Sequence, residues 1–367
     1  MKIGFFGEGI GPVFNEAGAN HVRDLCNIFN GTIVTWNDIG FSLLKRTDNS
    51  WILNGKFIYR DYPILHDLNG ALCLLMARTL TFKFNIIYLI DLIDNRWFKY
   101  MPLEKSIHPV TANIKYLNEY ALKNYVKNIA PRLGGIVAQT KTIEDQLINL
   151  GISPGKIHVI YPAIDLQKFQ DISCPDIQQF RIAFASSPTV KDKGYDYFFE
   201  KGVPILLKAF KEFSGIINSK LYLLWRNVYK EELGQLIKEL RLEKDVIIYD
   251  RTINMPELYN KIHATIIPYI SLNSSPDFPS SAIESLACGK PVITTTIPEM
   301  YRIIQQEKCG SVAKPTKEDL VGAMINCYEN YNLFRNKCRF VAEKYFNIHN
   351  EANKLEEIHK SISYIKI

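Results

Sequence analysis

The chain has 367 residues, of which 47% are hydrophobic and 22% are charged. This balance excludes a disordered or fibrous protein, and the length favours two domains. The net charge of +6 is dispersed along the sequence. Such a charge favours anionic ligands or a membrane surface, and no nucleic-acid partner is expected because nucleic-acid binding needs a clustered basic stripe.

The sequence carries no sign of a membrane span, an export signal or a disulfide framework. Its best apolar run, residues 71–77, is far shorter than the roughly 18 residues that a spanning helix needs. The first residues lead directly into an apolar strand and a glycine, unlike a signal peptide. The seven cysteines include no C-x-x-C pair. We therefore expect a cytoplasmic protein, with peripheral contact at the inner membrane face as an open alternative.

The first half of the chain alternates short apolar runs with segments of helical periodicity. Strands are expected at residues 2–6, 32–36, 57–59, 86–90 and 135–138, and helices at residues 21–29, 68–80, 114–129 and 142–150. This alternation predicts a parallel sheet covered by helices on both faces.

The same alternation restarts after a polar stretch near residue 174. Strands are expected at residues 181–185, 220–225, 246–249, 265–268 and 291–295, and helices at residues 203–213, 231–240, 280–287, 317–328 and about 333–362. The pattern predicts two Rossmann-like α/β domains at residues 1–168 and 169–345 with a cleft between them. A C-terminal helix at residues 346–367 is expected to pack back on the first domain.

The segment SSAIESLACGKPVITT, residues 280–295, is the most informative for chemistry. Ser280 is a good N-cap, and Gly289 and Pro291 stop the expected helix before an apolar strand. A helix that begins at the carboxyl edge of a parallel sheet directs free amides toward the cleft, which favours a diphosphate. Local features alone favour the plainer interpretation, a capped helix with a surface carboxylate at Glu284.

Four segments, in order, resemble group-1 retaining glycosyltransferases of the GT-B fold, which are glycosyltransferase family 4-like. IESLACGKPVITT, with the preceding DFP, resembles their E-x7-E signature. AGANHVRDL resembles their glycine-containing loop and first helix, KIHVIYPAIDLQKF their interdomain strand and linker, and EKGVPILLKAF their lysine-glycine turn and helix. The resemblance covers nearly the whole chain. It implies two doubly wound domains, the first binding the acceptor and the second binding a nucleotide-sugar donor.

The resemblance also implies roles for individual residues. Glu284 is expected to hold the donor ribose, because a cis-diol can donate two hydrogen bonds to one carboxylate. Lys201 is expected to neutralise the diphosphate as a point charge. The expected donor-binding set is Gly18, Asn20, Lys201, Arg226, Arg251, Asp277, Ser280, Ser281 and Glu284.

The chain departs from the family pattern at several positions. Pro276 stands where the first glutamate of the signature is expected, so Asp277 is the nearest acid that can contact the sugar. The usual arginine after the first strand of the second domain is missing. Arg226, at the end of the strand pattern LYLLWR, is the candidate replacement, and Arg251 is a weaker candidate near the base.

In the first domain, the expected histidine-aspartate pair reads Ile90-Asp91. His66 follows an apparent strand end and is the other titratable candidate, with a hydrogen-bonded structural histidine as the alternative. For His108, in an expected loop, the structural interpretation is favoured. The catalytic candidates are therefore Lys201, Arg226, Asp91 and His66.

No D-x-D motif or cluster with metal-ligand spacing is present, so we expect no metal and no cofactor, the nucleoside diphosphate sugar being a substrate. The segment RWFKYM, residues 96–101, combines aromatic and basic side chains. Two interpretations of it remain open: an acceptor platform or shallow membrane contact, and a plain loop with its aromatics packed inward.

The sequence thus predicts retaining transfer of a sugar to the hydroxyl of a glycan, a lipid-linked or a small-molecule acceptor, in surface polysaccharide, glycolipid or glycoconjugate synthesis. Two alternatives remain open. Pro276, Ile90 and the missing arginine suggest a GT-B-like binding or scaffold protein that has lost catalysis. A sugar-nucleotide epimerase on the same architecture is the other.

Overall fold

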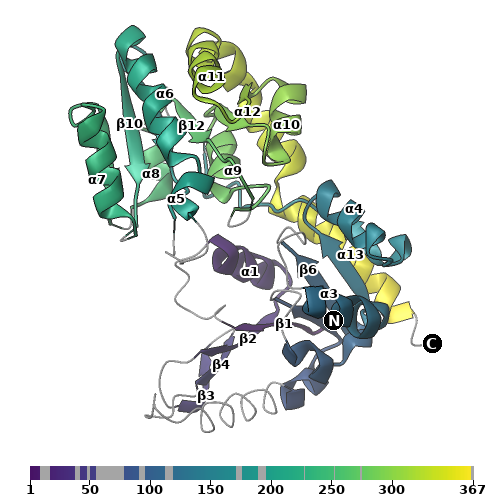
Figure 1. Cartoon of the computed structure of the whole chain (residues 1–367). Coiled ribbons are helices and arrows are strands. Elements are labelled where there is room, and N and C mark those ends of the chain that lie inside the picture. The colour runs from purple at the N-terminus through teal and green to yellow at the C-terminus, as the bar shows by residue number, and fades with distance from the viewer. Residues whose placement is uncertain are drawn as a thin grey trace. The chain divides into compact units, whose positions relative to one another are not determined.

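The computed structural model describes residues 1–8, 17–37, 42–47, 50–54, 78–90, 96–111, 119–170, 176–188, 196–226, 228–251, 253–272 and 275–364. The chain forms two compact units, Met1–Ala163 with Ile348–Ile367, and Ile164–Asn347 (Figure 1). The units divide after Ala163 and not after residue 168, because Ile164 already belongs to the second unit. Its N–H donates to the Phe346 carbonyl at 3.0 Å, and it pairs with Asn347 in an isolated bridge.

Unit 1 is built on an eight-stranded sheet in the order β3-β4-β2-β1-β5-β6-β7-β8. Its strands are β1 (Ile3–Glu8), β2 (Thr32–Asn37), β3 (Ser42–Thr47), β4 (Ser50–Asn54), β5 (Ile86–Leu89), β6 (Ser106–Val110), β7 (Gly135–Ala138) and β8 (Ile157–Val159). All neighbours are parallel except β3 and β4, which form an antiparallel pair at the edge. The strand expected at residues 57–59 lies outside the described residues.

The longer helices of unit 1 are α1 (Ala17–Ile28), α3 (Glu119–Asn124), α4 (Lys141–Asn149) and α13 (Ile348–Tyr364). Short 3-10 helices η1 (Thr81–Lys83), η2 (Arg96–Tyr100), η3 (Leu103–Lys105), η6 (Ala130–Arg132) and η7 (Pro154–Lys156), and the π-helical turn η5 (Tyr125–Ile129), join them. Most of the helix expected at residues 68–80 lies outside the described residues. The segment expected as one helix at 114–129 changes after Asn124 into the π turn.

The sheet of unit 1 is buried on both faces. Along β1, Phe6 enters one apolar cluster with Ile87, whereas Phe5 enters the other with Tyr88. Successive side chains of a strand point to opposite faces, so a strand buried on both sides has a continuous apolar sequence. Helix α13 contributes Ile348, Leu355, Ile358 and Ile362 to the second cluster.

Unit 2 has a six-stranded, all-parallel sheet in the order β11-β10-β9-β12-β13-β14. Its strands are β9 (Phe180–Phe184), β10 (Ser219–Leu224), β11 (Val246–Tyr249), β12 (Ala264–Ile267), β13 (Val292–Thr295) and β14 (Gly310–Ala313). Its helices are α5 (Tyr197–Glu200), α6 (Val203–Ile216), α7 (Lys230–Glu239), α8 (Met255–Tyr259), α9 (Ser280–Ala287), α10 (Met300–Glu307), α11 (Lys317–Glu329) and α12 (Tyr331–Tyr345). Both sheets are doubly wound, which confirms the predicted fold class.

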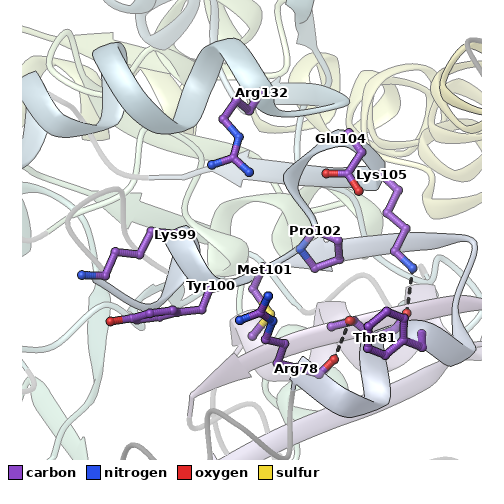
Figure 2. Close-up of a pocket in the computed structure, with 10 residues that line it drawn as sticks. Arg78, Thr81, Lys99, Tyr100, Met101, Pro102, Glu104, Lys105 and Arg132 are labelled. Atoms are coloured by element: carbon purple, nitrogen blue, oxygen red, sulfur yellow. Dashed lines mark hydrogen bonds between the residues drawn. The ribbon is translucent and has the colours of Figure 1, made fainter.

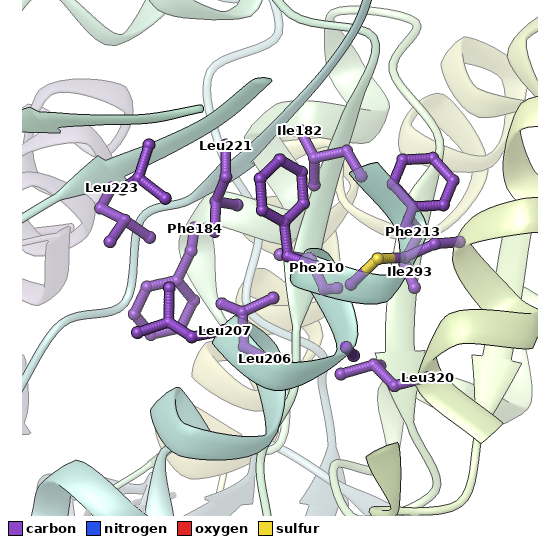
Figure 3. Close-up of a cluster of buried hydrophobic side chains, with 14 of the residues drawn as sticks. Ile182, Phe184, Leu206, Leu207, Phe210, Phe213, Leu221, Leu223, Ile293 and Leu320 are labelled. Carbon is purple, nitrogen blue, oxygen red and sulfur yellow. The ribbon is translucent and has the colours of Figure 1, made fainter. Parts of the chain in front are cut away.

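The core of unit 2 forms where α6 and α11 cover one face of this sheet. Leu206 and Phe210 of α6 pack with Ile182 and Leu221 of the strands and with Leu320 of α11 (Figure 3). Each of these side chains is fully buried. This packing fixes α6, and therefore the turn that precedes it, against the sheet.

The expected C-terminal helix at 333–362 is two helices, since α12 ends at Tyr345 and α13 begins at Ile348. Among the residues that the structure describes, no helix is long and apolar enough to cross a membrane. Five cysteines within the described ranges are buried free thiols: Cys26, Cys288, Cys309, Cys327 and Cys338.

Candidate functional site

The strand order of unit 2 reverses between β9 and β12, which lie side by side in the sheet. In open α/β sheets, ligands bind outside the carboxyl ends of the strands at such a switch point. Ser186 follows β9, and Tyr269 follows β12. Arg226 follows β10, the next strand. The topology therefore brings these three residues to the edge where a ligand is expected.

The turn before α6 places Lys201 at this edge. Gly202 adopts φ 73°, a left-handed conformation that favours glycine. A Cβ atom on Gly202 would lie 1.7 Å from the Pro268 carbonyl oxygen, so only glycine fits. The carbonyl of Glu200 accepts a hydrogen bond from the N–H of Ile270 at 2.8 Å. The turn is thus fixed directly against the end of β12.

The Lys201 side chain is 6% exposed and lies among polar and aromatic groups. Its Nζ is 3.4 Å from Ser186 Oγ and 5.1 Å from the centre of the Tyr269 ring. A hydrogen bond joins Ser186 Oγ to Tyr269 Oη. In the part of the chain that the structure describes, no carboxylate forms an ion pair with Lys201.

Burial, together with the positive charge of Arg226, lowers the pKa of Lys201 to about 8. The ammonium group is therefore still charged at neutral pH, but it is poorly compensated. An anion that binds between two neighbouring cations offsets their mutual repulsion and stabilises the charged form of both. Lys201 and Arg226 are therefore brought together as the sequence predicted, and an anionic group is the ligand that suits them.

Helix α9 starts at Ser280, one residue earlier than a Ser280 cap requires, so that prediction was wrong. The cap is Pro279, with φ −61° and ψ 129°, and no side chain caps the helix. The Pro279 carbonyl accepts from the amides of Ala282 and Ile283 at 2.9 and 3.2 Å. Ser280 and Ser281 occupy the first helical positions, where backbone amides lack an intrahelical acceptor and can donate to an anion.

Glu284 lies one turn into α9 beside Tyr259 of α8. The Tyr259 hydroxyl is 2.9 Å from Glu284 Oε2 and 3.0 Å from the Ser281 carbonyl oxygen. Burial raises the pKa of Glu284 to about 7, and the hydrogen bond from Tyr259 opposes that rise. The contact of Glu284 with a donor ribose stays a prediction.

Asp277 is buried and caps the start of α10. Its Oδ1 accepts a hydrogen bond from the Glu299 amide at 2.8 Å. Burial raises the pKa of Asp277. The contact of Asp277 with a donor sugar stays a prediction. Arg251 follows the edge strand β11 and is exposed, and its contact with a base also stays a prediction.

The candidates of unit 1 are described in part. Gly18 and Asn20 lie in the first turn of α1, and a Cβ atom added to Gly18 would meet nothing within 4 Å. The backbone there is open to a ligand, but phosphate binding stays a prediction. His66 and Asp91 lie outside the described residues. Ile90 is half-buried, and its amide donates to the Phe6 carbonyl at 2.7 Å.

His108 lies in β6, not in the loop that the sequence predicted. It is fully buried, with Nδ1 2.7 Å from the Tyr125 hydroxyl and its ring edge-on to Phe98. The structural interpretation of this histidine is confirmed. The strand contains Pro109, and proline argues against a central strand when the sequence is considered locally.

Some side chains of the RWFKYM segment pack inward and others are exposed, so each of the two predicted interpretations applies to part of it. It forms η2, and Phe98 and Met101 pack inward. Tyr100 is 43% exposed, and Lys99 Nζ lies 4.9 Å from the centre of its ring. The inward-packing interpretation is therefore correct for Phe98, whereas Lys99 and Tyr100 present an exposed cation and an aromatic ring.

Sequence reasoning missed Ser186 as a lysine partner, Tyr269 and Tyr259. Tyr269 follows a buried apolar strand directly, a signal that could have placed it at the carboxyl edge. Tyr259 and Glu284 are 25 residues apart, and their pairing leaves no sequence signature. Within the described ranges, no group of three or more His, Cys, Asp or Glu side chains is arranged to hold a metal.

Parts of the chain are similar in sequence to known glycosyltransferases. Residues 196–344 match the sequence model of glycosyl transferases group 1. A Campylobacter jejuni N-acetylgalactosamine-N,N'-diacetylbacillosaminyl-diphospho-undecaprenol 4-alpha-N-acetylgalactosaminyltransferase is 30% identical over 190 residues, 50% of this chain and 48% of that protein. Mannosylfructose-phosphate synthase of Agrobacterium fabrum is 27% identical over 229 residues, 57% of this chain and 48% of that protein. The chain thus spans about half the length of these two relatives.

Solved structures show the fold over nearly the whole chain. Anabaena HepE in complex with UDP superposes with a TM-score of 0.76 at 16% identity, over 98% of this chain and 100% of that one. A glycosyltransferase from Rickettsia africae gives a TM-score of 0.73 at 16% identity, over 98% of each chain.

The two doubly wound units and the switch-point site of unit 2 therefore define a protein of the GT-B fold. Within it, residues 196–344, which include Lys201 and Glu284, match the sequence model of glycosyl transferases group 1.

Proposed function

We propose that this chain is a glycosyltransferase that moves a sugar from a nucleoside diphosphate sugar to an acceptor hydroxyl. The observation that carries the proposal is the pair of cations at the switch point of unit 2. Lys201 is buried there, lacks an acidic partner among the described residues, and feels the charge of Arg226. A diphosphate is the group of a sugar donor that meets this requirement.

In the proposed reaction, the bond between the anomeric carbon and the diphosphate oxygen breaks, and its electron pair leaves with the nucleoside diphosphate. Lys201, Arg226 and the first amides of α9 stabilise that growing charge. The acceptor oxygen bonds to the anomeric carbon and gives up its proton to the departing diphosphate oxygen. Glu284 holds the ribose and fixes the donor in place.

We further propose, from the family resemblance, that the anomeric configuration is retained and that no metal takes part. Unit 1 is proposed to bind the acceptor, which is a glycan, a lipid-linked or a small-molecule hydroxyl compound. The Campylobacter jejuni relative acts on a diphospho-undecaprenol compound, which supports a lipid-linked acceptor. It also supports a place in glycolipid, polysaccharide or glycoconjugate synthesis and peripheral contact with the inner membrane face.

The test is a thermal-shift screen with UDP-, GDP-, ADP- and dTDP-sugars, beginning with UDP because Anabaena HepE binds it. A ligand of the folded state raises the melting temperature with or without turnover. The matched pair of variants is Lys201→Met and Lys208→Met, since Lys208 is an exposed lysine of the neighbouring helix α6. Stabilisation by a donor that Lys201→Met abolishes and Lys208→Met retains supports the proposal.

Donor consumption with and without EDTA then separates the remaining functions. If the sugar of the donor is transferred or hydrolysed, and EDTA does not change the rate, the result supports a metal-independent transferase. Binding without any donor consumption indicates a degenerate binding protein. A donor converted to its epimer indicates an epimerase. Equal binding by both lysine variants would show that the cation pair is not the donor site.

A further inference from the structure

Unit 1 contains a second basic site, a pocket of about 450 Å³ whose walls are short 3-10 helices. Its lining includes four cations and a single carboxylate, Glu104. The cations are Arg78, Lys99, Lys105 and Arg132. A cavity of this volume accommodates a small ligand, and the excess of positive charge selects an anionic one.

The pocket lies at the edge of the sheet opposite to the one where a GT-B domain is expected to bind its substrates. Its walls η1, η3 and η6 come immediately before strands β5, β6 and β7, so they meet at the amino ends of these strands. Ligands of doubly wound sheets bind at the carboxyl ends. The pocket is therefore separate from the predicted acceptor site of this unit.

One cation holds the pocket walls together, and the two arginines face its interior. Lys105 Nζ donates to the carbonyls of Thr81 and Phe84, both at 2.7 Å, and so ties η1 to η3. Figure 2 shows the guanidinium groups of Arg78 and Arg132 facing the same space from two sides. Both arginines are exposed, and neither forms an ion pair with a described carboxylate.

Arginine suits this arrangement because its planar fork of donors matches the oxygens of a phosphate. An apolar rim adjoins the charges: Phe82 is 84% exposed and Tyr100 is 43% exposed. A phosphate ester with an organic group attached satisfies both features, since the phosphate meets the arginines and the remainder contacts the rings.

We propose that this pocket is a binding site for a phosphate ester, distinct from the donor site of unit 2. Two sources share that chemistry, the headgroup of an anionic phospholipid and a soluble sugar or glycerol phosphate. The site does not depend on the proposed sugar transfer, because it lies in the other unit and uses other residues.

The experiment uses the full chain with Lys201→Met, so that phosphate does not report on the donor site. Binding is measured to vesicles of phosphatidylglycerol with phosphatidylcholine, to pure phosphatidylcholine vesicles, and to soluble glycerol phosphate. The pocket variant is Arg78→Gln with Arg132→Gln. The matched control is Lys354→Gln with Lys360→Gln, which removes two exposed cations of α13 in the same unit.

We expect saturable binding to the anionic vesicles or to glycerol phosphate. The pocket variant should weaken this binding more than about tenfold, because hydrogen bonds between charged groups are stronger than neutral ones. The control should weaken it less than about twofold. Vesicle binding alone identifies the lipid source, and glycerol phosphate binding identifies a soluble one. Equal weakening by both double variants, or no saturable binding to either probe, overturns the proposal.

If the pocket variant does not fold, a second measurement tests the site. Hydrogen exchange of the Lys201→Met chain with its pocket intact should slow at residues 78–84 and 99–105 when the bound probe is added. Protection confined to other segments contradicts the site. Donor stabilisation of the chain that retains Lys201 is recorded separately, so failure of this pocket and failure of the proposed transferase remain distinguishable.

Discussion

Replacing Lys201 by methionine should stabilise the unliganded protein while removing donor binding. The pKa of Lys201 falls from its ordinary value of 10.5 to about 8 because the group is buried and lies near Arg226. Each pKa unit corresponds to about 1.4 kcal/mol, so keeping the charge in the folded state at pH 7 costs about 3 kcal/mol. Methionine fills a similar volume without that charge.

The gain is reduced by the contacts that methionine does not make. The hydrogen bond to Ser186 and the position beside the Tyr269 ring contribute about 1–2 kcal/mol together. A net gain of about 1–2 kcal/mol should raise the melting temperature by about 3–6 °C for a unit of this size. Differential scanning calorimetry of Lys201→Met and Lys208→Met, with and without donor, is the assay. A lowered melting temperature for Lys201→Met together with unchanged donor binding would refute the reasoning.

The same pKa gives a pH signature with a defined sign. Between about pH 8 and 10.5, the unfolded chain keeps the Lys201 proton and the folded chain has lost it, so stability rises with pH in that window. The Lys201→Met variant should lack this rise. Donor affinity should fall above about pH 8, because a neutral amine no longer attracts the diphosphate. An equally steep rise in both proteins would contradict this assignment.

Three further substitutions test other parts of the structure. Gly202→Ala should destabilise the protein by more than about 2 kcal/mol and abolish donor binding, because the turn must open to make room for the Cβ atom. The control Gly215→Ala, where the added Cβ atom lies in open space on helix α6, should stabilise the protein by about 0.5–1 kcal/mol. Similar melting temperatures of the two variants would contradict this expectation. Tyr259→Phe removes the hydrogen bond that keeps the pKa of Glu284 from rising further, so Glu284 should become protonated at a higher pH than in the unchanged protein. When donor binding is titrated downward from pH 8.5 to 6, the variant should therefore lose binding at a higher pH. An unchanged midpoint counts against a role for the carboxylate. Burial lowers the pKa of His359 to about 4, so unit 1 should lose stability as the pH falls from 6.5 to 4, and His359→Gln should melt with a flatter acid dependence; parallel curves would exclude this histidine as the cause.

The sequence predicted unit 2 well where periodicity and breakers coincide. The expected helix at 280–287 matches α9, because an apolar stripe is followed by Gly289 and Pro291. Strand β14 was missed because its sequence, GSVA, is short and only weakly apolar. Its place depends on parallel pairing with β13, which no local pattern reports. Helix α10 was missed for a related reason, since its polar face obscures a narrow buried stripe.

Unit 1 was harder to predict because polar residues and proline enter its strands. The edge strand β3 carries the charged residues Lys45 and Arg46, and only two residues separate it from β4 in the sequence. Strand β6 contains His108 and Pro109, which favour a loop when considered locally. Parallel pairing with β5 on one side and β7 on the other overrides that preference.

The candidate site was predictable where a motif carries it and not where two segments meet. The lysine-glycine turn predicted Lys201 from adjacent residues. The contact between Ser186 and Tyr269 joins positions 83 residues apart, so it follows only from the neighbouring positions of β9 and β12 in the sheet. The perturbed pKa values of Lys201 and Glu284 also depend on burial by distant segments and could not be derived from the motif.

Helix α13 completes the core of unit 1 although it is synthesised after unit 2. Unit 2 is one uninterrupted stretch, Ile164–Asn347, and all of it is synthesised before α13. Unit 1 begins first but lacks four core side chains until Ile348, Leu355, Ile358 and Ile362 emerge. The earlier domain of the nascent chain is therefore the later one to mature. Until α13 has been made and has emerged, the apolar sheet face that it covers is available to chaperones or to aggregation.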